Sequence, residues 1–490
     1  MIDDAALDAL LRAAPWMPED GRAAERYERV DHAVLGSAAL LLVVAAVGGP
    51  AAGRRFLVPV RAGAGGRLEE ALGSDAFDEA AVARTLTGGR LHTARGGTVE
   101  FRGPGRAAAR VRRLPFERGW SSNALSLVDI AGTPCIHKTY RRLDEPVHEP
   151  ELLRRMNGTG STPEWIGDYA YVDPADGTRH PLGVVYRYAK GDGIDTPLRE
   201  NLRAMWPRLA DGVDHEDVVD AHLRPLEGKL RGAGAFLAAF HHDLAERLPG
   251  SATYPVRDAI GDAARRVDLL ERHDGLQLPA AARASAYASL RAELTLLEAD
   301  FDEARVHPDA GPCHGDLHLS HLLRDGDGAW RMTVIDLSTP ALSPAEPGWS
   351  EQSPLQDLVA IERALEYFAA DEAAFESARR LGVDSLETML AALDGAREGP
   401  EHQRAVVREV FGAADAWRER VLRMLLGTGS PGPLRRLLYV RRLLHELAYN
   451  QAHARPYHAA IDLRHARALG PATAPPTAPP IAPAIAFARK

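Results

Sequence analysis

The residues best suited to chemistry are acids and a lysine whose order along the chain is the one that phosphoryl transfer requires. Asp316 follows His314 by two positions in a predicted loop, and His321 lies five residues after Asp316. Asp336 ends a short apolar run. Phosphoryl transfer needs a carboxylate at the acceptor hydroxyl, metal ligands and a lysine on the nucleotide phosphates. We therefore predict Asp316 as the catalytic carboxylate, and Asp336 and His321 as metal ligands.

Lys138 is the candidate for the group that contacts the nucleotide. It stands near the end of the second strand of a predicted hairpin, and a predicted helix carrying Glu149 and Glu151 follows. In kinase sites an acid on that helix pairs with the lysine. We take Glu151 as this acid, with Glu149 as the alternative.

Residues 106–190 have the element order of a kinase N-lobe. Apolar and β-branched residues predict strands at Leu125–Ile130 and Thr133–Tyr140, joined by a tight turn. A helix is expected at Glu149–Met156 and another strand at Leu182–Tyr188. The second of these strands carries the lysine, so the hairpin would position it.

From about residue 199 to residue 465 the pattern becomes helical. Apolar residues recur at spacings of three and four over Leu223–Leu248, Leu290–Phe301 and Leu434–Tyr449. The segment Cys313–Ile335 interrupts this pattern with a loop and a short hairpin. A mostly helical C-lobe would thus carry the catalytic loop.

The two ends of the chain differ from this central part. Apolar runs at Leu40–Val47 and Arg55–Val60 predict a hairpin in a small N-terminal domain. Pro and Ala alternate over Pro471–Pro483, which predicts an extended tail that buries no core. The sequence predicts an α+β fold with four parts: an N-terminal domain at 1–104, the N-lobe at 105–190, the helical C-lobe at 191–466 and the tail at 467–490.

Composition excludes several classes of protein. The net charge of -9 arises from mixed acids and bases without a long basic stripe, which argues against a nucleic-acid partner. The strongest apolar run, Ala33–Val47, is shorter than the ~20 residues that a membrane-spanning helix needs. Two cysteines, Cys135 and Cys313, predict no disulfide framework. With an acidic N-terminus unlike a secretory signal, we expect a cytoplasmic protein.

The loop sequence is similar to that of a known family. Residues 313–323, Cys-His-Gly-Asp-Leu-His-Leu-Ser-His-Leu-Leu, and residues 333–336, Thr-Val-Ile-Asp, resemble the catalytic and metal loops of aminoglycoside phosphotransferases. They most closely resemble those of actinobacterial maltokinases and glucosamine kinases. The resemblance implies a two-lobed, protein-kinase-like fold with an N-terminal cap domain. It also implies ATP and Mg²⁺ as cofactors and a hydroxyl of a sugar, amino sugar or aminocyclitol as phosphate acceptor.

Further matches assign residues around the substrates. Ser121, Ser122 and Asn123 resemble the family's loop over the nucleotide phosphates. A helix with an Asp six positions before an Arg, and a later helix followed by Arg-Pro, resemble the helices that form the family's sugar pocket. The resemblance, with the loop residue two positions after Asp316, gives the predicted acceptor residues: His318, Asp357, Arg363, Glu446, Tyr449 and Arg455.

One of these residues has a structural alternative. Arg363 lies inside a predicted helix, three positions before Glu366. At this spacing an arginine and a glutamate are neighbours on the helix surface and commonly form an ion pair. Arg363 would then support the fold instead of binding a phosphate on the substrate.

Two positions depart from the family pattern. His321 stands where the family carries Asn or Gln, and imidazole is a poor ligand for Mg²⁺. Either His321 acts through water, or Mn²⁺ is accepted, or activity is weakened. Ser338 replaces an acid that follows the metal-binding Asp in relatives. These changes favour an altered acceptor.

Three functions are therefore open. The first is a sugar or aminocyclitol kinase acting as a monomer or homodimer. The second is an enzyme that inactivates aminoglycoside antibiotics by phosphorylation. The third is a pseudokinase that binds nucleotide as a scaffold or sensor, against which the retention of Lys138, Asp316 and Asp336 argues, because these are the groups with the largest electrostatic roles.

Overall fold

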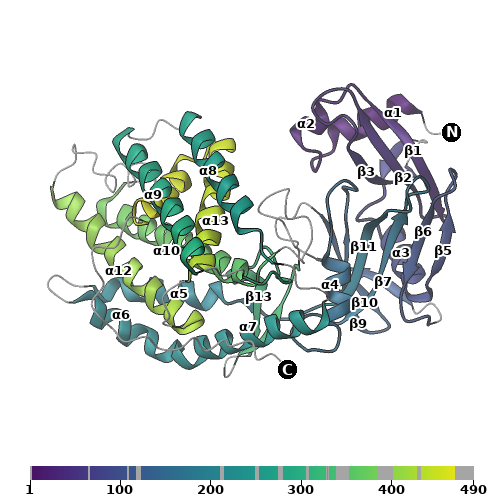
Figure 1. The fold of residues 1–490 in the computed structure, drawn as a ribbon. Helices are drawn as coiled ribbons and strands as arrows, with labels where there is room; N and C mark the ends of the chain where they lie inside the picture. The colour runs from purple at the N-terminus through teal and green to yellow at the C-terminus, as the bar shows by residue number, and fades with distance from the viewer. Residues whose placement is uncertain are drawn as a thin grey trace. The chain divides into compact units, whose positions relative to one another are not determined.

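A computed structural model describes most of the chain (Figure 1). The residues described are 3–63, 67–106, 110–116, 123–209, 214–248, 253–273, 280–304, 308–326, 328, 330–337, 352–383, 401–427 and 432–469. They form two compact units. Unit 1 spans residues 1–190 and also takes in 335–338, and unit 2 comprises the rest of the chain.

Unit 1 begins with an antiparallel sheet in the strand order β1-β2-β3-β4. Alternating burial along Arg26–Leu35 (β1) and near-continuous burial of Ala39–Val47 (β2) place the central strand in the core. The apolar side chains of the first helix pack beneath them, with Leu7 and Leu11 fully buried. The remaining elements of this part are α1 (Asp4–Ala13), α2 (Glu19–Arg22), β3 (Arg55–Ala62) and β4 (Leu68–Glu70).

A second antiparallel sheet of unit 1 has the order β5-β6-β10-β11-β9-β8-β7. The first two strands lie between residues 89 and 102, so the first 104 residues contribute to both sheets. Its strands are β5 (Gly89–His92), β6 (Thr98–Arg102), β7 (Val111–Leu114), β8 (Ala124–Ile130), β9 (Thr133–Thr139), β10 (Trp165–Val172) and β11 (Arg179–Arg187). Two helices accompany it: α3 (Asp75–Thr87) and α4 (Glu149–Met156).

The two sheets of unit 1 are joined directly after β9. The amide of Leu57 on β3 donates to the carbonyl of Arg141 at 2.7 Å, and the amide of Leu143 donates to the carbonyl of Arg55 at 3.0 Å. Arg141 also binds Glu70 on β4. Because β9 carries Lys138, the first sheet braces the chain just beyond that lysine.

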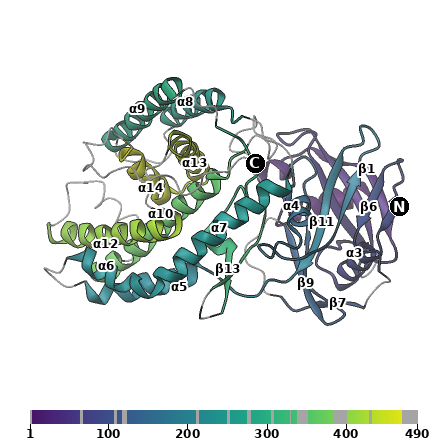
Figure 2. The ribbon, with the colours of Figure 1, turned by 60° about the horizontal axis from the view of Figure 1, so that its bottom comes forward.

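Unit 2 is mostly helical (Figures 1 and 2). In Figure 2 the long helices α10 and α12 lie side by side, and α8 and α9 form a pair. Leucines of α13 are buried against α8, α9 and α14 in one large apolar cluster. The helices are α5 (Asp195–Met205), α6 (His215–Leu223), α7 (Glu227–Arg247), α8 (Val256–Arg272), α9 (Ala280–Ala304), α10 (Leu355–Leu381), α12 (Glu401–Leu426), α13 (Pro433–Ala452) and α14 (Pro456–Arg467).

A small sheet interrupts the helices of unit 2. Leu322–Asp325 (β13) pairs with Asp192–Gly193 (β12) on one side and with Arg331–Val334 (β14) on the other. Short 3-10 helices at Trp206–Arg208 (η2), Arg224–Leu226 (η3) and Leu319–His321 (η4) complete this unit. The hairpin β13–β14 follows the predicted catalytic loop at once, as expected from the sequence.

The predicted fold class is confirmed: a sheet-rich part is followed by a helical part. The predicted strands and the helix around Lys138 are present within one or two residues of their expected bounds. In the part of the chain that the structure describes, no helix has the length and apolarity needed to cross a membrane.

Candidate active site

Lys138 is the centre of a buried charged cluster in unit 1. It points from β9, and its side chain is only 5% exposed. Its Nζ lies 2.6 Å from Oε2 of Glu149, the first residue of α4, and the hydroxyl of Tyr140 donates to the same oxygen at 2.6 Å. Glu149 itself is 2% exposed. The structure thus pairs Lys138 with Glu149, while the carboxylate of Glu151 binds Arg154 and Arg155.

Asp336 also contacts Lys138. The chain leaves β14 at Val334, and Asp336 adopts a left-handed backbone conformation with φ 58°. Aspartate tolerates this region better than most residues because its short polar side chain can bond locally. Its Oδ1 forms an ion pair with Nζ of Lys138, although its own side chain remains 47% exposed. Lys138 therefore joins the predicted metal ligand to the helix acid.

Burial and charge oppose each other in this cluster. Burial lowers the pKa of Lys138, but the carboxylates of Glu149 and Asp336 outweigh it and raise that pKa above its usual value. For Glu149 burial has the opposite effect and raises the pKa, although the charge of Lys138 opposes this shift. An ammonium held among carboxylates stays charged at neutral pH, which is the state that binds phosphate.

The Asp316 loop in unit 2 is held by a residue from α10. The side chain of Asp357 is fully buried, and its two oxygens accept the amides of His314 at 2.7 Å and Gly315 at 2.8 Å. Nε2 of His241 on α7 bonds the same carboxylate at 2.8 Å. Asp357 was expected at the acceptor. The structure instead uses it to satisfy buried backbone donors, which would otherwise remain unpaired.

The histidines of the loop contact one another. Nδ1 of His321 donates to the carbonyl of Asp316 at 3.0 Å, and the ring of His318 lies 3.5 Å from the ring of His321 between centroids. Nδ1 of His318 bonds the hydroxyl of Ser320 at 2.8 Å. Because Nδ1 of His321 carries the donated hydrogen, a metal would have to bind this ring through Nε2. His321 braces the loop that carries Asp316.

Asp316 has a cationic neighbour that the sequence did not single out. Its side chain is 45% exposed, and Nη2 of Arg442 on α13 lies 3.2 Å from its Oδ1. Burial raises the pKa of Asp316, but Arg442, His318 and His321 more than offset it and hold the pKa below its usual value. Asp316 is therefore an ionised carboxylate at neutral pH, as a group that accepts a hydroxyl proton must be.

The same arginine links Asp316 to Glu446. Nε of Arg442 donates to Oε1 of Glu446 at 2.7 Å, and Nε of Arg363 donates to Oε2 at 2.8 Å. Arg363 is fully buried and also pairs with Glu366 and Asp462. Its alternative role, an ion pair with Glu366, is the one observed. Glu446, 14% exposed, connects this buried cluster to Arg442.

The other residues predicted to bind the acceptor or the nucleotide are either more exposed to solvent or lie outside the described residues. Tyr449 is 44% exposed, with the ring of His453 4.0 Å away and the guanidinium of Arg455 5.4 Å from its ring. Asn123 precedes β8 in unit 1. Ser121, Ser122 and Ser338 lie outside the described residues.

Mg²⁺ is the metal that the chemistry implies, and Asp336 suits it. Mg²⁺ binds proteins through one or two carboxylates together with substrate phosphates. Asp336 offers a partly exposed carboxylate of this kind. Across the described residues no cluster of three or more His, Cys, Asp or Glu side chains makes a metal site by itself, so such an ion would need phosphate oxygens as well. The imidazole of His321 does not match this preference.

Comparison with protein families matches one domain of the chain. Residues 194–345 fit the model of the phosphotransferase enzyme family, called APH. This stretch contains Asp316, His321 and Asp336. These residues are therefore similar to that family. The chain is thus a phosphotransferase acting on small molecules, as predicted.

Solved structures with a similar fold match nearly the whole length of this chain. One crystal form of a glucosamine kinase gives a TM-score of 0.55 at 18% identity, and the match covers 94% of this chain and 99% of the glucosamine kinase chain. A second crystal form gives a TM-score of 0.53 at 19% identity, over 94% of this chain and 97% of the other chain. A complex of glucosamine kinase with glucosamine, ADP and inorganic phosphate gives 0.52 at 18% identity, over 94% and 98%. At this identity the likeness concerns the fold. No curated protein sequence matches the chain.

Proposed function

We propose that this phosphotransferase moves the γ-phosphate of ATP to a hydroxyl group of a sugar, amino sugar or aminocyclitol. The observation that carries the proposal is the ion pair of Lys138 with both Glu149 and Asp336. These are a phosphate-binding lysine, its orienting acid and a metal-binding carboxylate, which kinases bring together on the nucleotide.

Asp316 provides the chemistry at the acceptor. Its carboxylate accepts the hydrogen bond of the attacking hydroxyl and takes its proton as the new phosphorus–oxygen bond forms and the bond to ADP breaks. Arg442 keeps the carboxylate ionised. Asp357 and His241 fix the backbone on which Asp316 stands. Correct positioning of this kind supplies much of the rate in phosphoryl transfer, because little covalent chemistry is left for the protein.

Lys138 and Asp336 serve the nucleotide. Lys138 donates to phosphate oxygens, and Glu149 holds its ammonium in place. Asp336 would hold Mg²⁺, which neutralises charge on the phosphates when bound. When the nucleotide binds, contacts of Lys138 and Asp336 with the nucleotide would replace the ion pair between them. We propose ATP in preference to other nucleotides because of the kinase pattern of the loop.

For the acceptor, an amino sugar is the first candidate. One glucosamine kinase of this fold is known in complex with glucosamine. An aminoglycoside is the alternative, and both are hydroxyl-rich molecules that carry amines. In this protein Arg442 stands beside Asp316, so the acceptor must present a hydroxyl to Asp316 while its amines avoid the guanidinium.

The test is ATP turnover with purified protein against a panel of acceptors, in Mg²⁺ and separately in Mn²⁺. The panel contains glucosamine, maltose, an aminocyclitol and several aminoglycosides. We expect one class of acceptor to raise ADP release well above the rate with ATP alone. Asp316→Ala should remove that increase by about 10²- to 10⁴-fold, the usual contribution of a positioned base.

Two controls separate the remaining functions. Asp325→Ala removes an exposed acid that pairs with Arg331 on the nearby hairpin, and it should leave turnover unchanged. Phosphorylation confined to aminoglycosides, with protection of an expressing host, would assign the antibiotic-modifying alternative. Nucleotide binding with no transfer to any acceptor in either metal would contradict the proposal and favour a scaffold.

A further inference from the structure

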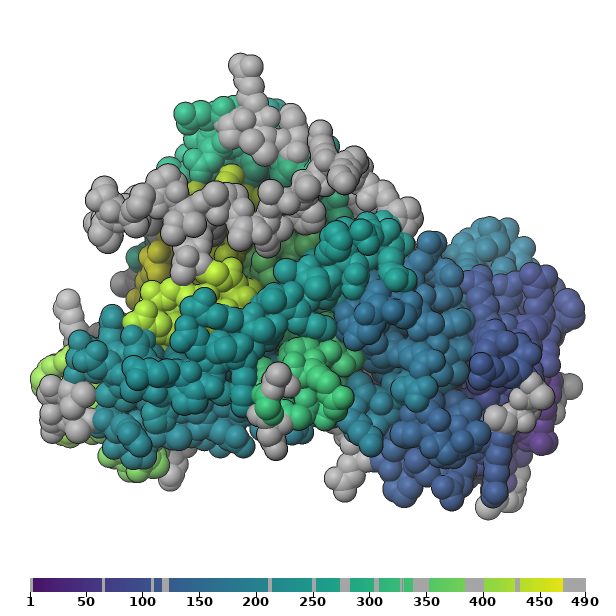
Figure 3. Space-filling view, turned by 90° about the horizontal axis from the view of Figure 1, so that it is seen from below, coloured from purple at the N-terminus to yellow at the C-terminus, as the bar shows by residue number. Residues whose placement is uncertain are grey.

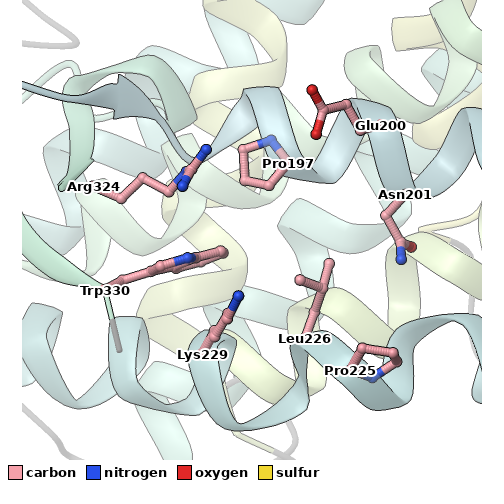
Figure 4. A pocket seen from close by; sticks show the side chains of 8 residues that line it. All are labelled: Pro197, Glu200, Asn201, Pro225, Leu226, Lys229, Arg324 and Trp330. Carbon is pink, nitrogen blue, oxygen red and sulfur yellow. The ribbon is translucent and has the colours of Figure 1, made fainter. Parts of the chain in front are cut away.

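A pocket of about 350 Å³ lies in unit 2 beside the β13–β14 hairpin (Figure 4), and Figure 3 shows this green hairpin at the molecular surface. Its walls carry charges of both signs, since Glu200 lines it together with Lys229 and Arg324. The indole of Trp330 lies between these two cations, which are each 5.9 Å from the ring centre. A ligand ring could not stack on the indole without displacing one of them. The pocket therefore favours no single class of ligand, whereas buried groups of unit 1 form a more specific arrangement.

Strand β9 carries polar side chains on both of its faces. Successive side chains of a strand point to opposite faces, so His137 and Thr139 lie on the face opposite Lys138. They are 1% and 2% exposed. The partners of His137 come from α3 and β10, which pack together in unit 1 (Figures 1 and 2). The strand that carries the lysine is therefore held from behind as well.

His137 joins Asp78 on α3 to Tyr169 on β10. Its Nδ1 bonds Oδ1 of Asp78 at 2.9 Å, and its Nε2 bonds the hydroxyl of Tyr169 at 3.0 Å. Because a carboxylate is an acceptor, Nδ1 carries the hydrogen of the first bond, and Nε2 of the neutral ring accepts the second. Burial raises the pKa of Tyr169, so its hydroxyl keeps the proton that it donates. All three side chains belong to residues at most 2% exposed, and each nitrogen of the imidazole has a partner of the right kind.

Tyr169 reaches His137 across β11, which lies between β10 and β9 in the sheet. Gly183 of β11 stands opposite Tyr169 on one side and opposite Thr139 on the other. A Cβ atom at Gly183 would lie 2.5 Å from the hydroxyl of Tyr169, closer than a real side chain can approach. Glycine within a strand often marks such a close approach. The missing side chain at Gly183 therefore lets the phenol lie over β11, where its hydroxyl is also 3.3 Å from Oγ1 of Thr139.

Asp78 also contacts the strand that precedes the predicted phosphate loop. Nε of Arg113 on β7 lies 3.1 Å from Oδ2 of Asp78. The chain continues from β7 to Ser121 and Ser122, which are predicted to lie over the nucleotide phosphates. One buried carboxylate of α3 thus binds β7 through Arg113 and β9 through His137. Burial of an acid costs free energy unless charged or hydrogen-bonded partners compensate it, and this acid has both kinds.

We propose that Asp78, His137 and Tyr169 are positioning residues, which hold β9 so that Lys138 meets the nucleotide phosphates. The acids around its ammonium hold the tip of the lysine side chain, whereas these three residues fix the strand from which that side chain extends. They act through Lys138, because they lie on the face of the sheet opposite that lysine. The inference rests on the proposed role of Lys138 in phosphoryl transfer, in which a displacement of ~1 Å can cost about 10²-fold in rate.

The test is calorimetric titration of the full chain with ADP in Mg²⁺, which needs no acceptor. Tyr169→Phe removes one hydroxyl and keeps the ring, and it should weaken ADP binding about tenfold, the effect of one displaced charge contact. Tyr171→Phe is the matched control, since Tyr171 lies two positions further along β10, is 1% exposed and donates to Asp31 at 3.1 Å. It should bind ADP as the unaltered protein does. Unchanged affinity in Tyr169→Phe, or equal losses in the two variants, would overturn the inference.

A double variant distinguishes positioning from a general loss of stability. If Tyr169 acts through Lys138, adding Tyr169→Phe to Lys138→Met should weaken ADP binding no further, because the effects of residues in one network are not additive. Thermal unfolding of each variant shows that it is folded at the temperature of the titration. A further tenfold loss in the double variant would mean that Tyr169 affects the nucleotide by another route, and the inference would be wrong.

Two variants at Asp78 test the bond to His137. Asp78→Ala should weaken ADP binding about tenfold or more, and Asp78→Asn should recover most of that loss, because its amide oxygen can still accept from Nδ1 of His137. An Asn variant as weak as the Ala variant would contradict the role of this bond. Bound ADP without transfer to any acceptor would contradict the proposed reaction but not this inference, whereas a full chain that binds no ADP would overturn both.

Discussion

The Lys138 cluster of unit 1 and the Asp316 loop of unit 2 are organised in opposite ways. Around Lys138 the functional groups hold one another, since the lysine pairs with Glu149 and Asp336 directly. Around Asp316 the positioning is done by residues without a chemical role, above all Asp357 and His241. Removing one functional group of the first region leaves a buried charge behind. Removing Asp316 leaves its scaffold intact.

This difference predicts that stability and activity are coupled in unit 1 and separable in unit 2. A buried ion pair whose partner is lost carries an uncompensated charge, at a cost of about 3–5 kcal/mol. A half-exposed carboxylate on a braced loop carries no such penalty. Substitutions in the two regions should therefore differ in thermal stability even where they abolish the same activity.

The largest effect is expected for Lys138→Met. Loss of the proposed phosphate-binding cation should lower kcat/KM by about 10²- to 10³-fold, as for other electrostatic groups at a transition state. The same change leaves Glu149 buried without its cation, so the free energy of unfolding should fall by about 3–5 kcal/mol. Steady-state kinetics and urea unfolding measure the two losses.

A second substitution separates the two losses at Lys138. Adding Glu149→Gln to Lys138→Met removes the stranded charge and should restore stability without restoring activity. Lys190→Met, at an exposed position of the same unit, is the matched control and should change neither. If the double variant were no more stable than the single one, the coupling in unit 1 would not arise from this ion pair.

Asp357→Asn probes the scaffold of unit 2. The amide keeps one oxygen but turns an NH₂ group toward buried N–H donors, so at least one hydrogen bond to His314, Gly315 or His241 is lost. We expect unfolding to require about 2–3 kcal/mol less, the range for a hydrogen bond to a charged group. A loop displaced by about 1 Å should lower kcat by about 10²-fold, with KM for ATP little changed.

Asp371→Asn is the matched control for Asp357→Asn, because it makes the same substitution on the same helix at a position 37% exposed. It should leave kcat unchanged. A normal kcat in Asp357→Asn would show that the loop keeps its position without this carboxylate, and the contrast between the two regions would disappear.

The residues proposed for the chemistry were easier to single out in the sequence than the residues that position them. Spacing and strand context led to Lys138 and Asp336, and these two side chains are in contact in the structure. The choice between Glu149 and Glu151 was harder, because residues two positions apart on a helix face different directions and only the start of α4 decides which one meets β9.

Residues that position others left a weaker signal in the sequence. Asp357 was predicted as functional, but two of its partners are backbone amides, which nearly every residue has. Arg442 stands next to Arg441 in the sequence, and only the phase of α13 separates them: Arg442 reaches Asp316, whereas Arg441 bonds the hydroxyl of Tyr254. A pair of residues so far apart in the sequence can be predicted only when the packing of the helices is known.

Arg442→Met tests the ion pair between Arg442 and Asp316. Without the guanidinium the pKa of Asp316 should rise, so the acid limb of the profile of kcat/KM against pH moves to higher pH. At neutral pH we expect a modest loss, about tenfold, the effect of one lost charge contact. Arg435→Met is a close control, since Arg435 lies on the same helix, is 20% exposed like Arg442 and pairs with Glu362. A shift of the acid limb in both variants would mean that the change is not local to Asp316.

The smallest effect on activity is expected at Asp462, at the far end of the chain of contacts through Glu446 and Arg363. Burial raises the pKa of Asp462 to about 7, although the charge of Arg363 opposes the shift. In the unfolded chain the pKa is about 3.9. Between these values the folded protein holds a proton that the unfolded chain releases, so stability falls as pH rises toward 7 and does not fall further above it.

Asp462→Asn removes this titration while keeping one oxygen for the hydroxyl of Tyr367 or the amide of Asn450. Relative to the unaltered protein, the variant should gain about 2.7 kcal/mol of unfolding free energy between pH 5 and pH 8, because about two pH units separate pH 5 from the pKa of about 7 and each is worth about 1.36 kcal/mol; kcat should be unchanged. Urea unfolding at several pH values measures the difference, and Glu419→Gln, at a position 62% exposed, should run parallel to the unaltered protein. A constant difference between Asp462→Asn and the unaltered protein would mean that Asp462 is already ionised at pH 5, because the charge of Arg363 outweighs burial. The buried cluster around Arg363 would then be a set of ionised partners like the Lys138 cluster of unit 1, and the two regions would not differ in this respect.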